Sequence, residues 1–98
     1  MAQTSKVGTH RTTIKNSDML LQVTYHETAV VTYNRHTGRV KLDTGGYFSA
    51  TTKTRMNQTS AQFNIPFHVY QKNYEWFVSV PGRDDLRFSG DSVEFQVQ

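Results

Sequence analysis

The chain of 98 residues contains no cysteine, which excludes disulfides, thiolate metal sites and cysteine nucleophiles. It has no apolar run near the roughly 20 residues that a membrane-spanning helix needs. Its first residues, MAQTSKVGTHRTT, lack the apolar stretch of a secretory signal. We therefore expect a protein that stays in the cytoplasm and does not enter a membrane.

Motifs for catalysis or metal binding are also missing. The histidines are too far apart in the sequence for local metal ligation, at positions 10, 26, 36 and 68. His26 and Glu27 are adjacent, so on a strand they would point to opposite faces. No serine has the turn that surrounds a catalytic nucleophile, and Asp84 and Asp85 fall in a predicted turn. We expect a protein that is not an enzyme and holds no cofactor or metal.

Charge is distributed unevenly along the chain, although the formal net charge is only +3. Residues 1–60 contain eight Lys and Arg against three Asp and Glu, whereas residues 61–98 contain three against five. A basic half is typical of chains that meet an anionic partner, such as nucleic acid or an acidic protein surface. The alternative is that folding mixes both halves into an ordinary surface.

The N-terminal residues differ from the rest in pattern. Residues 1–17 are polar and basic and show no sustained apolar period, so we predict a flexible basic arm that contributes little to the fold. Residues 18–98 are predicted to form one β-rich domain, because the chain has the usual length of a single domain.

Alternating apolar and polar residues predict about seven strands. In the hairpin that contains Gly38, Val40 and Leu42 are expected to point inward and Arg39 and Lys41 outward. Turn residues between the runs favour antiparallel pairing. The strands are expected at residues 19–25, 28–33, 39–42, 67–71, 74–80, 86–88 and 93–97.

A single helix is predicted over residues 49–64. Met56 and Phe63 lie seven positions apart and share one helical face, and Ser49 or Thr51 is suited to cap the first turn. The fold class is therefore α+β, mostly antiparallel β with the helix packed on a sheet face. The solvent side of the helix is expected to hold Lys53 and Asn57.

The turn before this helix is the strongest candidate for a partner-binding site. Gly45 and Gly46 leave backbone amides that a ligand can approach, and Tyr47 supplies an aromatic anchor. The helix start adds a positive end together with Lys53 and Arg55, both expected in water. The alternative is a plain strand-to-helix turn beside a solvated helix face.

Further candidate contacts are cations and aromatic side chains. The predicted hairpin places three positive charges together, at Arg35, Arg39 and Lys41. Exposed aromatics among basic residues can stack single-stranded bases, and those expected at the surface are Tyr47, Phe48, Tyr70 and Tyr74. The aromatics expected in the core are Phe63, Phe67, Trp76 and Phe77.

The segment GGYFSATTKTRMNQ at residues 45–58 resembles a stretch in small proteins encoded by bacteriophages and prophages. In that stretch two glycines and an aromatic precede a TTKxRMNQ run. The resemblance extends over residues 25–78 and includes the run FHVYQKNYEWFV. It implies a phage accessory protein made in the cytoplasm of the bacterial host, and it implies no particular activity.

Together these features lead us to expect a phage-encoded, non-enzymatic binding protein. Its expected role is to modulate or inhibit a host protein or nucleic-acid-handling complex, in host takeover or anti-defence. The alternative is a protein that binds single-stranded or double-stranded nucleic acid directly through its basic N-terminal half.

Overall fold

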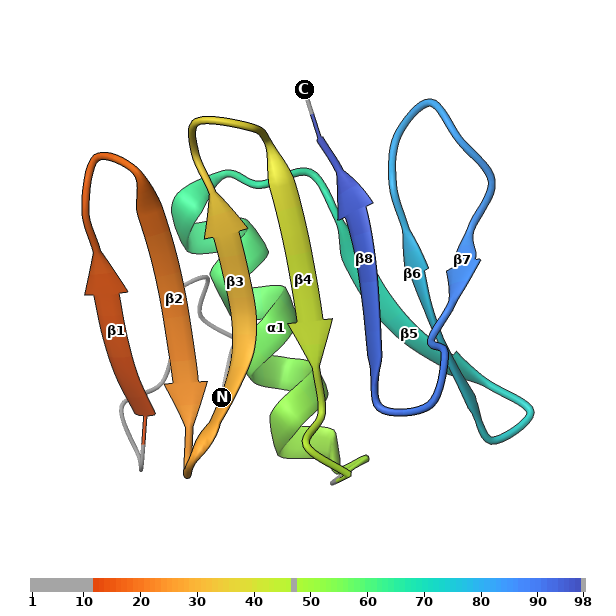
Figure 1. The fold of residues 1–98 in the computed structure, drawn as a ribbon. Helices are drawn as coiled ribbons and strands as arrows, with labels where there is room; N and C mark the ends of the chain where they lie inside the picture. Colours follow the sequence, from red (N-terminus) through yellow and green to blue (C-terminus); the bar gives the residue numbers. More distant parts are fainter. Residues whose placement is uncertain (1–11, 47, 98) are drawn as a thin grey trace.

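A computed structural model of the chain describes residues 12–46 and 48–97. This part of the chain contains eight strands and one helix (Figure 1). In chain order they are β1 (Thr12–Asn16), β2 (Leu20–Tyr25), β3 (Thr28–Asn34), β4 (Arg39–Asp43), α1 (Ala50–Phe63), β5 (His68–Lys72), β6 (Glu75–Ser79), β7 (Leu86–Arg87) and β8 (Ser92–Gln96).

The elements form two layers. One layer is a five-stranded antiparallel sheet in the order β1-β2-β3-β4-β8. Behind it lie α1 and the three-stranded antiparallel sheet β5-β6-β7, side by side (Figure 1). The predicted α+β class, mostly antiparallel with one helix on a sheet face, is confirmed. No helix in the described part of the chain is long and apolar enough to cross a membrane.

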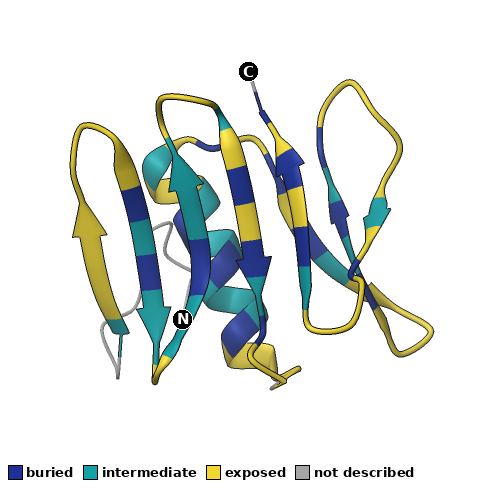
Figure 2. Cartoon of the chain, viewed as in Figure 1, coloured by how far each residue is buried: buried dark blue, intermediate teal, exposed yellow. Residues whose placement is uncertain are grey.

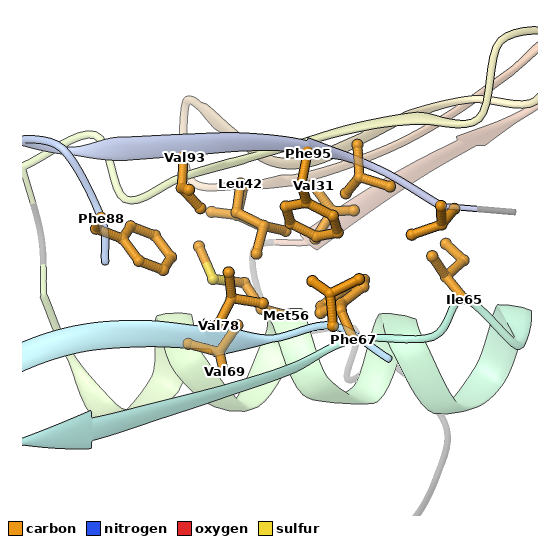
Figure 3. Close-up of a cluster of buried hydrophobic side chains, with 14 of the residues drawn as sticks. Val31, Leu42, Met56, Ile65, Phe67, Val69, Val78, Phe88, Val93 and Phe95 are labelled. Atoms are coloured by element: carbon orange, nitrogen blue, oxygen red, sulfur yellow. The ribbon is translucent and has the colours of Figure 1, made fainter. Parts of the chain in front are cut away.

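The core fills the space between the two layers. On β4, Val40 and Leu42 are fully buried while Arg39 and Lys41 are exposed, as the alternation predicts. Pairing extends this inner face to β8, where Phe95 lies opposite Val40 and Val93 opposite Leu42. Figure 2 shows the resulting alternation of buried and exposed residues along the strands. In Figure 3, β8 side chains meet those of Phe67, Val69 and Val78 from the second layer.

Helix α1 begins and ends where its flanking residues predict. Ser49 is the N-cap, and its hydroxyl oxygen accepts a hydrogen bond from the amide of Thr52 at 3.1 Å. Asn64 ends the helix in the left-handed conformation. Met56 is fully buried and Phe63 packs against the core, so the predicted buried face of the helix is confirmed.

Asn57 does not face solvent, and that prediction is wrong. Its side-chain oxygen accepts a hydrogen bond from the amide of Val69 at 2.7 Å, and its side-chain nitrogen donates to the carbonyl of Val69 at 2.9 Å. Val69 is the second residue of β5, the outer strand of its sheet. The side-chain amide of Asn57 thus makes the two hydrogen bonds that a neighbouring strand would make, and it joins the helix to β5.

The predicted flexible arm over residues 1–17 needs a correction. Thr12–Asn16 form β1, which pairs along its whole length with β2. The strand was missed because Ile14 is its only apolar residue, so no alternating pattern marks it. The remainder of the predicted arm, residues 1–11, lies outside the described part of the chain.

We predict that Asn57→Ala lowers the free energy of unfolding by roughly 1–3 kcal/mol, because it leaves both backbone groups of Val69 without their partner. Asn57→Asp keeps the hydrogen-bond acceptor but loses the donor. Its free energy of unfolding should therefore lie between those of Asn57→Ala and the wild type. The control is Thr51→Ala, at an exposed position of the same helix, which should change stability little. Urea denaturation measures all four proteins, and an Asn57→Ala midpoint equal to that of Thr51→Ala would contradict the role of this contact.

Candidate functional site

The turn at Gly45 and Gly46 has its backbone amides already engaged. The Gly45 amide donates to the carboxylate of Asp43 at 2.8 Å, and the Gly46 amide donates to the hydroxyl of Thr44 at 3.2 Å. These side chains close the turn locally. The glycine pair predicted amides that point toward a ligand, but both amides point toward Asp43 and Thr44 instead. Tyr47, the aromatic predicted to act with them, lies outside the described residues.

Lys53 and Arg55 diverge from each other. Residues that are two positions apart in a helix, such as these, lie about 200° apart around its axis. The Lys53 ammonium lies 5.8 Å from the ring centre of Trp76 on β6, whereas the Arg55 guanidinium lies 5.5 Å from the ring of Tyr25 on β2. Both residues are half-buried, so the prediction that both are in water is wrong.

Arg55 serves the packing of β1. Its Nε donates a hydrogen bond to the hydroxyl of Thr12 at 3.0 Å, and Tyr25 lies beneath the guanidinium. Thr12 and Tyr25 also line a hollow of about 840 Å³ between the helix start and the ends of β1 to β3. Hydroxyl groups dominate its described lining, which includes Thr13, Thr28, Thr44, Ser49 and Thr52.

The three predicted cations of the β3–β4 hairpin lie away from this turn. Arg39 and Lys41 point to the outer face of the five-stranded sheet, and Arg39 lies 3.8 Å from Glu94 of β8. Arg35 precedes β4 and donates to the side chain of Asn16 at 2.6 Å. The hairpin and Gly45 are at opposite ends of β4 (Figure 1), about 14 Å apart along the strand. The structure therefore does not join the two predicted groups into one surface.

A different cluster forms around the one tryptophan of the chain. The ring of Phe48 meets Trp76 edge to face at a centroid distance of 5.3 Å, and Phe88 meets it on another side at 5.7 Å. With Lys53 above the same indole, these contacts hold Trp76 in place at 4% exposure. A hollow of about 300 Å³ lies here, and its lining includes Phe48, Tyr74, Trp76 and Phe88.

Tyr74 projects beside this hollow from the turn between β5 and β6. Lys72 pairs with Glu75, which leaves Asn73 and Tyr74 as a two-residue turn, and both have positive φ, 52° and 68°. Glycine is the favoured residue at the second position, because positive φ is costly for a bulky side chain. Tyr74 is nonetheless 96% exposed. We name Phe48, Lys53, Tyr74 and Trp76 the aromatic edge.

Tyr70 and Phe77 form a second aromatic pair, on the outer face of the three-stranded sheet. Their rings stack at a centroid distance of 5.5 Å with planes 16° apart. Phe77 is therefore not a core residue, and that prediction is wrong, whereas Phe67 and Trp76 are buried as expected. The Tyr70 hydroxyl donates a hydrogen bond to the carboxylate of Asp85, which raises the pKa of the phenol; desolvation and the charge of Asp85 add to the shift.

The candidate site is thus a group of aromatic side chains with one cation, carried by an α+β scaffold. In residues 12–46 and 48–97, no three His, Asp or Glu side chains gather as they do around a metal ion. The described ion pairs, Arg39–Glu94 and Arg87–Glu75, are both at the surface.

Comparison with known proteins identifies the family. The family model described as Kyanoviridae Gp96 protein matches residues 1–96, so the chain belongs to this bacteriophage family. The phage origin implied by the sequence resemblance is confirmed in this general form. The comparisons with curated proteins and with solved structures give no match.

The glycine pair allows a matched stability test. Gly45 has a φ of 63°, and a Cβ there would lie 2.3 Å from the hydroxyl oxygen of Thr28, whereas a Cβ on Gly46 meets nothing within 4 Å. Both positions have positive φ, so both alanine substitutions are strained, but only Gly45→Ala adds a clash. We predict that Gly45→Ala destabilises the protein by at least about 1 kcal/mol more than Gly46→Ala. Equal thermal midpoints would contradict the close approach of Gly45 to Thr28.

Proposed function

We propose that this phage protein is a non-enzymatic binding protein that modulates or inhibits a host protein or nucleic-acid-handling complex inside the infected cell. It does so by contact through the aromatic edge. The phage family supports action in the host, and the surface chemistry supports contact with a partner.

Tyr74 is the observation that carries this proposal. A side chain that is 96% exposed at a φ of 68° adds almost nothing to the core, and the turn would be more stable with glycine in its place. Contact between the tyrosine ring and a partner molecule would explain why a residue that is unfavourable for folding stands at this exposed position. Tyrosine is among the residues most enriched at the energetic centres of protein interfaces.

The neighbours of Tyr74 suit the same role. Phe48 is 47% exposed but fixed at one side by the indole of Trp76, so its free surface is already ordered. Lys53 brings a positive charge to the same indole. Ordered side chains lose less conformational entropy when a partner binds, and a cation at the rim steers an acidic partner surface toward the aromatic rings.

We predict that Tyr74→Gly abolishes capture of the host partner without weakening the fold. Glycine at positive φ relieves the turn, so the free energy of unfolding should stay equal or rise by a few tenths of a kcal/mol. The partner is defined as the host protein that the wild-type chain retains from host-cell extract at physiological salt. Its yield should fall at least tenfold with Tyr74→Gly.

The matched control is His26→Gly. His26 is also an exposed residue at positive φ, 58°, in a two-residue turn between β2 and β3, but it lies outside the aromatic edge. This variant should retain the partner at wild-type yield. If Tyr74→Gly is folded and still captures the same protein as well as His26→Gly does, the aromatic edge is not the contact surface.

Direct nucleic-acid binding is the second candidate, and the outer face of the five-stranded sheet favours it. Lys15, Gln22, Thr32 and Lys41 lie in one cross-strand row on this face, and Arg39 lies beside Lys41. Binding of short DNA or RNA that weakens steeply with added salt, and is lost in Lys15→Glu with Lys41→Glu, would favour this candidate. Absence of binding at low salt would dismiss it.

A further inference from the structure

Charged side chains complete the wall of the hollow at the aromatic edge. Its described lining includes Glu75 and Arg87 as well as the aromatic rings. In the register of β6 and β7, Arg87 lies opposite Phe77. Glu75 is two residues before Phe77, so both charged side chains leave the sheet on the same face. They meet where Nη1 of Arg87 donates a hydrogen bond to Oε1 of Glu75 at 3.1 Å.

This contact uses only part of the Arg87 guanidinium. An arginine side chain has five N–H donors. Among residues 12–46 and 48–97, the only hydrogen bond that this guanidinium makes is the one to Glu75. The side chains of Arg87 and Glu75 are 63% and 50% exposed, and an ion pair in water adds little to stability. A second carboxylate can therefore bind the remaining N–H groups, or replace Glu75, without disturbing the fold.

The aromatic walls of the hollow suit an aliphatic side chain better than a nucleotide base. A base binds an aromatic residue by stacking on the face of its ring, but Trp76 is only 4% exposed. Lys53 lies over its indole, and Phe48 and Phe88 meet the indole edge to face. The hollow measures about 300 Å³, which is the lower limit of ligand pockets. It therefore has room for one side chain and not for a larger ligand.

The charges around the hollow favour an acidic ligand. Lys53 and Arg87 contribute two positive charges, and Glu75 is the only acidic residue in the described lining. A carboxylate is a planar acceptor that matches the fork of an arginine, and the contact with Glu75 shows that a carboxylate reaches this guanidinium. The ligand that fits both features is an apolar side chain next to a carboxylate.

We infer that the aromatic edge binds an acidic segment of the host partner. An aliphatic side chain of that segment enters the hollow, and a neighbouring carboxylate binds the guanidinium of Arg87 beside Glu75 or in its place. Glu75 then competes for the same guanidinium and limits the affinity. This inference rests on the proposed function, because it gives the chemistry of the partner at the same surface.

A defined probe tests the inference without knowledge of the host partner. Trp76 is the only tryptophan of the chain, so its indole N–H gives one resonance in a ¹H–¹⁵N spectrum of the full chain. Titration with the peptide acetyl-Ser-Asp-Leu-Glu-Ser-amide should shift this resonance until it saturates. The uncharged peptide acetyl-Ser-Asn-Leu-Gln-Ser-amide should bind at least about fivefold more weakly, because it lacks the carboxylates.

Substitutions of the ion pair should change the affinity for the acidic peptide in opposite directions. Arg87→Gln removes the carboxylate-binding group and should weaken binding at least about fivefold. Glu75→Gln removes the competitor and should strengthen binding at least about twofold. The controls are Arg83→Gln and Asp84→Asn, which remove the same charges from exposed positions between β6 and β7. Both controls should bind the peptide like the wild type.

A resonance that does not move with the acidic peptide, or equal affinities for the two peptides, would overturn the inference. So would an Arg87→Gln or Glu75→Gln variant that binds the acidic peptide as its control does. If a short oligothymidylate saturates the same resonance more tightly than the acidic peptide, the hollow is a nucleic-acid site instead. The proposed function fails on a separate result, which is capture of the host partner by Tyr74→Gly at wild-type yield.

Discussion

The paired hydrogen bonds between Asn57 and Val69 hold the second layer together. They are joined by the hydroxyl of Ser60 on α1, which donates to the carbonyl of Phe67, the residue before β5, at 2.7 Å. The buried edge of a strand needs partners for its backbone groups, and one side-chain amide supplies both a donor and an acceptor. This contact sets the position of the helix along β5.

The aromatic edge depends on that position. Lys53 lies four residues before Asn57, so both side chains lie on the same side of α1. When Asn57 is bonded to β5, Lys53 reaches Trp76 on the neighbouring strand β6. Phe48, just before the helix cap, meets the same indole. The surface that we propose for partner contact is therefore assembled from a helix, the turn before it and a strand, and the hydrogen bonds of Asn57 and Ser60 join that helix to the chain at β5.

Much of the fold could be predicted from the sequence because the signals were local. Alternation marked the strands with two or more buried residues, such as β4 with Val40 and Leu42, and the Ser49 cap marked the helix start. β1 could not be predicted, because a five-residue edge strand whose only apolar residue is Ile14 shows no alternating pattern. The contact of Asn57 with Val69 could not be predicted, because a polar residue that bonds to a buried strand edge has the same sequence pattern as a polar residue in water.

The candidate site was predicted less well, for a reason that depends on geometry. Gly45, Gly46, Lys53 and Arg55 are close in sequence, but helical geometry sends the two cations to different strands, and the glycine amides bond to Asp43 and Thr44. The angle between Lys53 and Arg55 follows from their spacing, so this divergence could have been foreseen. The meeting of Phe48 with Trp76 could not, because it depends on how the helix and β6 pack.

The central claim is that a partner contacts the protein at the aromatic edge. Trp76 is the only tryptophan of the chain, so protein labelled with 5-fluorotryptophan gives a single ¹⁹F resonance from within this surface. Unlabelled host-cell extract should shift or broaden that resonance in proportion to the amount added, because the partner changes the surroundings of the indole. A resonance that keeps its position and width, while sedimentation shows that the labelled protein has entered a larger complex, would place the contact elsewhere and contradict the account.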